Sequence, residues 1–165
     1  QASAEACATD GTPNQFIPKK AADAKPLENE FEKHPKCPYC GMDRREHHRA
    51  RMLVQYADDV NDGVCSIHCL SLSLGLNIDR EPKLIFGPDY GSTAEPRPLL
   101  PVEQLTKHSF ASVDIAKEFQ AKHGGVLAKF DDALRESYLD MASDASMIRK
   151  NREERRKRAA EKKAG

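Results

Sequence analysis

The sequence predicts an α+β protein with two small units in tandem, each made of a β-hairpin or strand, a helix and a further strand. Two observations predict this class: short alternating apolar segments stand beside segments with helical apolar spacing, and Gly or Pro turn signals separate them. The 165 residues, 39% hydrophobic and 32% charged, suit one modest domain or two half-sized ones. A deep core of several layers is therefore excluded.

The composition changes along the chain and divides it into five segments. We expect an extended arm first, because this segment combines Ala, Pro, Lys and Glu with few large apolar residues and cannot offset the cost of backbone ordering. Two α+β units follow, joined by a Pro-rich connection, and the chain closes on a basic tail. The predicted segments are residues 1–33, 34–90, 91–107, 108–148 and 149–165, in that order.

The first unit is predicted to begin with a β-hairpin. Residues 51–56 alternate, with Met52, Val54 and Tyr56 on one face, as a half-buried strand would. Asn61-Asp62-Gly63 is typical of a tight turn, and the return strand follows at once.

A helix and a strand should complete this unit. Residues 70–76 fit a strand through their Leu-Ser alternation, but Cys69, Leu72 and Leu76 also share one helical face. We favour the helix. Residues 83–86 are apolar enough for a short strand, which Gly87-Pro88 would end.

The second unit contains the clearest helix signal. Ser112 is a good N-cap for a helix from Val113, and Gly124-Gly125 supplies its end. We expect strands at 108–111 and 126–130, and a second helix capped by Asp131.

The tail, residues 149–165, is charged on every face. It carries nine Lys or Arg against three Glu, a net charge of +6, and because the whole chain is neutral the remainder carries −6. Such a segment is expected to be a solvated helix or disordered, and it could contact an acidic partner or an anionic membrane surface. The acidic body and neutral pI argue against nucleic acid as a partner.

The first residues and the number of cysteines bear on the cellular compartment of the protein. Gln-Ala-Ser-Ala-Glu-Ala looks like the start of a processed, exported chain, so we expect a periplasmic or otherwise extracytoplasmic protein. The longest charge-free stretch, 63–78, is too short and polar to cross a bilayer. Five cysteines are an odd number, which argues against a complete disulfide framework.

Four cysteines form two close pairs, Cys37/Cys40 and Cys65/Cys69, and three kinds of site fit them. A glutaredoxin-like redox pair at Cys37 would need a buried strand directly before it, and the preceding residues are polar. A structural zinc site would use the four thiolates. We expect no catalytic residues and no enzyme activity.

The third kind of site includes the neighbours of each pair. Met42 lies two residues after Cys40, and His68 lies between Cys65 and Cys69. Soft thiolate and thioether ligands select Cu(I), and a mixed set can both hold and release it. The candidate metal ligands are Cys37, Cys40, Met42, Cys65, His68 and Cys69, for Cu(I) or alternatively Zn²⁺. By contrast, His47 and His48 stand among Arg44, Arg45 and Arg49, which indicates an exposed basic face.

The first motif, Cys37-Pro-Tyr-Cys40-Gly-Met42, followed by Arg-Met-Leu-Val and by Asp62-Gly63 before Cys-Ser-Ile-His-Cys69, resembles the NosL family. Members of this family are copper-accessory proteins of nitrous oxide reductase maturation. The resemblance spans roughly residues 34–141, and its later part is the stretch with the Gly-Gly turn.

The resemblance implies an exported, usually membrane-anchored metallochaperone that binds one Cu(I) and delivers it to a copper-receiving protein or a membrane-associated maturation complex. It implies ligands at Cys37 or Cys40 and at Met42. Family members commonly carry another Met before the strand aligned with 108–111, and residues 98–107 contain none. We expect Cys65, His68 and Cys69 to substitute for it, with His108 as a further candidate.

Overall fold

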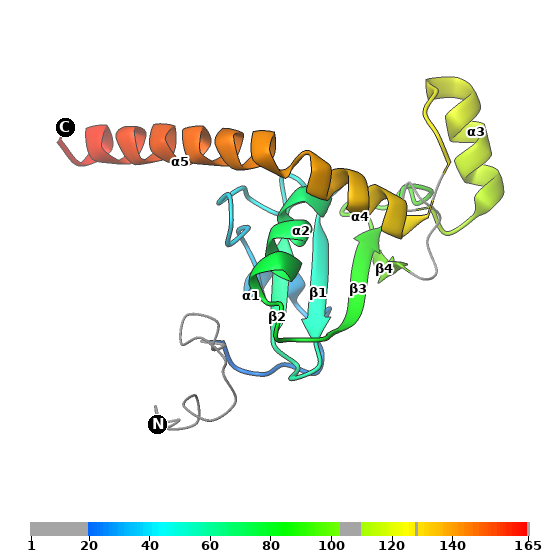
Figure 1. Ribbon diagram of the computed structural model, residues 1–165, viewed down its shortest axis with the longest axis horizontal. Coiled ribbons are helices and arrows are strands. Elements are labelled where there is room, and N and C mark those ends of the chain that lie inside the picture. The colour runs from blue at the N-terminus through cyan, green and yellow to red at the C-terminus, as the bar shows by residue number, and fades with distance from the viewer. Residues whose placement is uncertain (1–19, 103–109, 128, 165) are drawn as a thin grey trace.

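The computed structural model describes residues 20–102, 110–127 and 129–164. In these residues the α+β class is confirmed: a four-stranded antiparallel sheet, in the order β2-β1-β3-β4, lies beside helices (Figure 1). The strands are β1 Met52–Tyr56, β2 Asn61–Val64, β3 Pro82–Pro88 and β4 Leu99–Pro101. The helices are α1 Glu30–Lys33, α2 Ile67–Leu76, α3 Val113–His123, α4 Phe130–Leu139 and α5 Met141–Ala164.

Strand β1 is the centre of the molecule. All five of its residues are buried, because β2 and β3 flank it and both faces are covered. Met52, Val54 and Tyr56 belong to the core cluster that contains the cysteines and Leu70 of α2, whereas Leu53 packs with Phe86 and Leu99 in a separate cluster. The period-two pattern thus divides β1 between two cores.

The predicted hairpin is present, but its turn lies earlier than expected. Residues 61–63 are part of β2, where Gly63 pairs with Leu53. The connection uses Asp59, whose φ of 58° is in the left-handed region, and its carboxylate accepts a 2.8 Å hydrogen bond from the Gln55 side chain. Aspartate tolerates this conformation better than most residues, which the turn prediction overlooked.

The helix predicted at 70–76 is confirmed as part of α2, and the strand predicted at 83–86 is confirmed within β3. Gly87-Pro88 does not end this strand as expected, because both residues belong to β3 and pair with β4. The Pro-rich connection is wrong in one respect, because residues 99–101 form β4 and pair with β3. Pro101 lies at the end of β4, and β4 is an edge strand, where proline is tolerated.

In the second predicted unit the helix α3 is confirmed, with Gly124 at a φ of 75° directly after it. The strand predicted at 126–130 is wrong: Val126 is exposed and Phe130 begins α4. The side chain of Asp132 accepts a hydrogen bond from the backbone N–H of Lys129, so the helix begins before Asp131, the predicted cap. Of the strand predicted at 108–111, residues 108 and 109 lie outside the described residues.

The end of the predicted arm is folded, contrary to expectation. Glu30 in α1 is buried and forms ion pairs with Arg44 at 2.8 Å and Arg51 at 2.7 Å. Arg44 and Arg51 therefore neutralise the buried carboxylate of Glu30, a long-range contact that the composition of the arm does not indicate. Residues 1–19 lie outside the described part of the chain.

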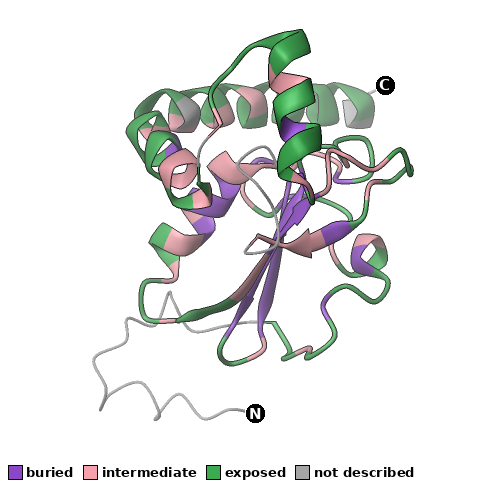
Figure 2. Ribbon diagram, turned by 90° about the vertical axis from the view of Figure 1, so that its right-hand side faces the viewer, coloured by how far each residue is buried: buried purple, intermediate pink, exposed green. Residues whose placement is uncertain are grey.

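The charged tail was predicted to be either a solvated helix or disordered, and in the structure it is helical. Helix α5 passes over one end of the sheet and continues beyond the body, with largely exposed residues (Figures 1 and 2). Helix α4 before it packs on α2, where the hydroxyls of Ser71 and Ser137 lie 2.5 Å apart. None of the helices in the described residues has the length and apolar character needed to cross a bilayer.

Candidate metal centre

Residues 37–42, which we call the knuckle, form a tight hairpin-like loop. The N–H of Cys37 donates to the carbonyl of Met42 at 2.9 Å, and the N–H of Gly41 donates to the carbonyl of Cys37 at 2.8 Å. Gly41 has a φ of 76°, which only glycine adopts without strain. Pro38 presets the φ of a turn position. The local sequence is therefore sufficient to bring Cys37 and Cys40 to the same side of the loop.

The environment of the knuckle lowers the pKa of both of its thiols. The pKa of Cys37 is lowered mainly by hydrogen bonds from the other cysteine side chains and to a smaller extent by the backbone of Cys40. The bond to Cys37 raises the pKa of Cys40, but the bonds to Cys65 and Cys69 and, to a smaller extent, the backbone of Met42 lower it to about 7 overall. Amide hydrogen bonds to sulfur stabilise the thiolate form, which is the form that binds metals.

The second pair is positioned by regular secondary structure. Cys65 directly follows β2, and Cys69 lies in the first turn of α2, so their sulfurs are 3.7 Å apart. Their position depends on the packing of α2 against the sheet. One contact that holds it is the hydrogen bond between the hydroxyls of Tyr56 and Ser73, at 2.7 Å.

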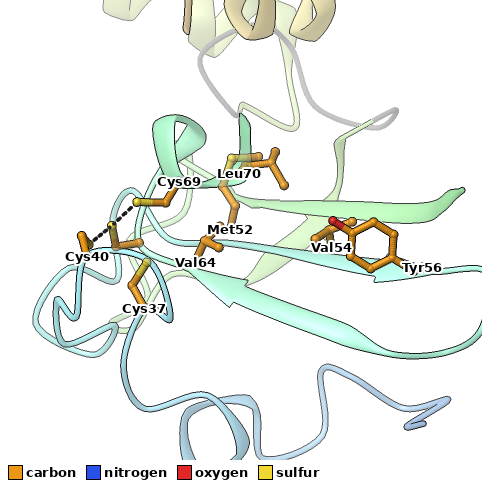
Figure 3. Close-up of a cluster of buried hydrophobic side chains, with 9 residues drawn as sticks. Cys37, Cys40, Met52, Val54, Tyr56, Val64, Cys69 and Leu70 are labelled. Carbon is orange, nitrogen blue, oxygen red and sulfur yellow. Dashed lines mark hydrogen bonds between the residues drawn. The ribbon is translucent and has the colours of Figure 1, made fainter. Parts of the chain in front are cut away.

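The two pairs meet in one cluster at the end of the sheet, with Tyr56 at the opposite end (Figure 3). The sulfurs of Cys40 and Cys65 are 3.3 Å apart, and all four sulfurs lie within 4.8 Å of one another. In a tetrahedral thiolate site with metal–sulfur bonds of about 2.3 Å, neighbouring sulfurs are about 3.8 Å apart. The four cysteines, all buried and all free of disulfide bonds, can therefore hold one metal ion.

Without a metal, the four thiols cannot all ionise. The pKa of Cys37 is lowered because its sulfur accepts hydrogen bonds from the other three thiols, that of Cys40 first. The pKa of Cys69 is raised, first by its hydrogen bond to Cys37. The four adjacent sulfurs therefore cannot all carry a negative charge in the metal-free cluster, and a bound cation would stabilise further ionisation.

A buried carboxylate ties the two halves of the centre together. Asp62 of β2 accepts hydrogen bonds from Tyr39 of the knuckle at 2.8 Å and from Ser73 of α2 at 2.7 Å, and it pairs with Lys20. Burial opposes ionisation, but these donors prevail and the pKa of Asp62 is lowered. The sequence predicted that Asp62 lies in a turn, and this role was missed. Nothing in the neighbouring residues indicates that its carboxylate would contact Tyr39 and Ser73.

Arg44 is the second residue that sequence reasoning missed. It was predicted to lie on an exposed basic face, yet its side chain is fully buried beneath the knuckle. It donates to the carbonyls of His34 at 2.7 Å, Val64 at 3.2 Å and Met52 at 3.3 Å, besides pairing with Glu30. A guanidinium with five donors can satisfy several carbonyls at once, which makes Arg44 a structural link between the knuckle and both hairpin strands.

The other candidate ligands lie in different positions. Met42 is partly buried and packs against the core cluster that contains the four cysteines. His68 is half-buried, and the group of four possible ligands does not include it. His47 is exposed, as predicted for the basic face, and His48 is half-buried. Cys7 and His108 lie outside the described residues.

Comparison of the chain with protein-family models, with curated proteins and with solved structures found no match. The arguments about function therefore rest on the cysteine cluster and its surroundings. The plain conclusion from them is that Cys37, Cys40, Cys65 and Cys69 form a site able to bind a metal ion.

Proposed function

We propose that the protein is an extracytoplasmic carrier that binds one Cu(I) ion in its cysteine cluster and delivers it to a copper-receiving protein or a membrane-associated complex. The observation that carries this proposal is the convergence of two cysteine pairs, far apart in sequence, into four sulfurs within 4.8 Å. Thiolates are the ligands that select Cu(I) and other soft or borderline metals over hard cations. The NosL-like motif of the knuckle is consistent with copper as the cargo.

Two further features favour a carrier over a permanent metal site. Met42, a thioether residue, packs against the cluster and is available as an additional or alternative soft ligand. An open cavity of about 320 Å³ also has Cys40 in its wall, so the centre lies just below a surface that a receiving protein can reach. A metal that must leave needs such access.

A structural zinc site is the second candidate, and the burial of all four cysteines favours it. In that case the ion would connect the knuckle to β2 and α2 permanently, and its removal would unfold the centre. The two candidates differ in Met42: a four-thiolate zinc site has no use for the thioether, whereas a Cu(I) carrier does.

The proposal is tested by titrating reduced wild-type, Met42→Leu and Cys40→Ser proteins with Cu(I) against a Cu(I)-chelating indicator, and in parallel with Zn²⁺. Leucine conserves volume and apolarity, so the metal-free stability of Met42→Leu should barely change. We expect its Cu(I) affinity or release rate to change, and Cys40→Ser to lose much more affinity. Identical Cu(I) affinities in all three proteins would contradict the copper proposal. Tight Zn²⁺ retention with indifference to Met42 would favour the structural site.

A further inference from the structure

One face of α5 is attached to the knuckle. Ile148 packs against the core cluster, and Arg152 and Arg155 follow it at helical spacing on the same face. Arg152 donates to the carbonyl of Pro38 at 3.2 Å, and Arg155 donates to the carbonyl of Cys40 at 3.0 Å. A methyl group on Gly41 would lie 2.7 Å from the Arg155 guanidinium, so the approach is close.

The same residues line the cavity beside Cys40. Its walls are Pro38, Cys40 and Gly41 of the knuckle and Arg152, Arg155 and Arg156 of α5. The outer residues Lys157 and Arg158 pair with Glu153 and Glu154 on the helix surface. Within the part of the chain that the structure describes, no carboxylate pairs with the three cavity arginines. The cavity therefore presents three guanidinium groups, and the two that bond to the knuckle, those of Arg152 and Arg155, have neutral carbonyls as acceptors.

We propose that this cavity is the docking site for an acidic segment of a partner protein, and that docking exposes Cys40. A carboxylate forms shorter and stronger hydrogen bonds with a guanidinium than a neutral carbonyl does, and it can bind both arms of the fork. An acidic side chain in the cavity therefore draws Arg152 and Arg155 away from the knuckle carbonyls. The cavity, an open recess of about 320 Å³ between a loop and a helix, has room for an acidic side chain.

This inference rests on the proposed function for its purpose, because the partner that approaches Cys40 would be the protein that receives the metal. The docking itself does not depend on which metal is bound. It can be tested on the reduced, metal-free full chain, so a failure of docking is distinguishable from a failure of metal binding.

The first test measures the binding of a fluorescent hexaglutamate peptide by anisotropy. The double variant Arg152→Gln/Arg155→Gln, called the inner variant below, should weaken binding about tenfold, because it removes two of the three cavity guanidinium groups. The matched control Lys157→Gln/Arg158→Gln removes the same charge one turn further along α5 and should weaken binding no more than about twofold. Equal losses in the two variants would overturn the cavity as the site. The proposal would also be overturned if the protein bound phosphatidylglycerol vesicles through Arg152 and Arg155 but did not bind the peptide.

The second test measures the exposure of Cys40 through its alkylation by a maleimide, followed by peptide mass mapping. Hexaglutamate should accelerate alkylation of Cys40 in the wild-type chain by about threefold or more, on the reasoning that the arginines leave the knuckle. The inner double variant should react quickly with or without the peptide, and the outer variant should behave as the wild type. An unchanged rate for Cys40 in the presence of bound peptide would overturn the claim that docking exposes the centre.

Discussion

The two halves of the cysteine cluster are built in different ways. The knuckle positions Cys37 and Cys40 through hydrogen bonds within six residues and through the left-handed Gly41. Cys65 and Cys69 are instead positioned by the end of a strand and the start of a helix, and their place depends on how α2 packs against the sheet. One half is local and the other is set by the whole fold, so substitutions should affect them differently.

The largest effect is expected from removing a sulfur. Cys40→Ser in the knuckle and Cys69→Ser in α2 should each lower metal affinity by about 100-fold or more, since a hydroxyl is a poor ligand for a soft metal. Competition with a chromophoric chelator measures this. Cys7→Ser serves as the control and should leave the affinity unchanged. If Cys69→Ser keeps wild-type affinity, the helical half does not bind the metal.

The next effect tests the contact between β2 and the two residues that flank the knuckle, His34 and Arg44. A methyl group on Gly63 would lie 2.5 Å from the Cβ of His34 and 2.8 Å from the guanidinium carbon of Arg44. Gly63→Ala should therefore destabilise the protein by about 1–3 kcal/mol, as overpacking does. Gly75→Ala in α2 is the matched control, because nothing lies within 4 Å of its added methyl group. Thermal unfolding compares the two, and an equal stability for both variants would refute the close packing.

The dependence of stability on pH tests the same region. Burial first, and then the charge of Arg44, lower the pKa of His34 from 6.5 to about 4. The unfolded chain therefore binds more protons than the native protein between pH 4 and pH 6.5, so stability falls as the pH falls through this window. We expect His34 to contribute about 1–2 kcal/mol to this loss, allowing for partial solvation of the ring. Denaturant unfolding of His34→Gln should show a flatter pH profile than that of the wild type, and the same substitution at the exposed His47 is the matched control.

The smallest effect is expected at His68. It lies between Cys65 and Cys69 in the sequence, but it is outside the group of four ligands. His68→Gln should change metal affinity by less than about threefold, measured in the same competition assay as the cysteine variants. A loss comparable to that of Cys69→Ser would return His68 to the ligand set.

The contrast between the halves also explains what the sequence could predict. The knuckle was recognisable because Cys-Pro-Tyr-Cys-Gly combines turn residues and ligands within five positions. Helix α2 was predicted from the spacing of its apolar residues and strand β3 from a short apolar run, although the strand continues through the Gly87-Pro88 that was expected to end it. These features depend on residues that are close in the sequence.

The misses depend on distant residues. Arg44 looks like one more surface arginine until Glu30 and the carbonyls of the hairpin strands surround it. Strand β4 has three residues and no alternation to detect, and pairing with β3 creates it. The tail has no apolar face, so its contact with the knuckle through arginine hydrogen bonds was not foreseeable from hydrophobic patterning.

The central claim is that both cysteine pairs hold the same metal ion. X-ray absorption on the reduced protein loaded with one equivalent of Cu(I), and separately with Zn²⁺, counts the sulfur atoms around the metal. We expect one ion per chain, bound by three or four sulfurs at about 2.3 Å with no nitrogen neighbour. Since the knuckle contains only two cysteines, the Met42→Leu variant should keep at least three sulfurs. A shell of two sulfurs in that variant, or one that mixes sulfur and nitrogen, would contradict the account.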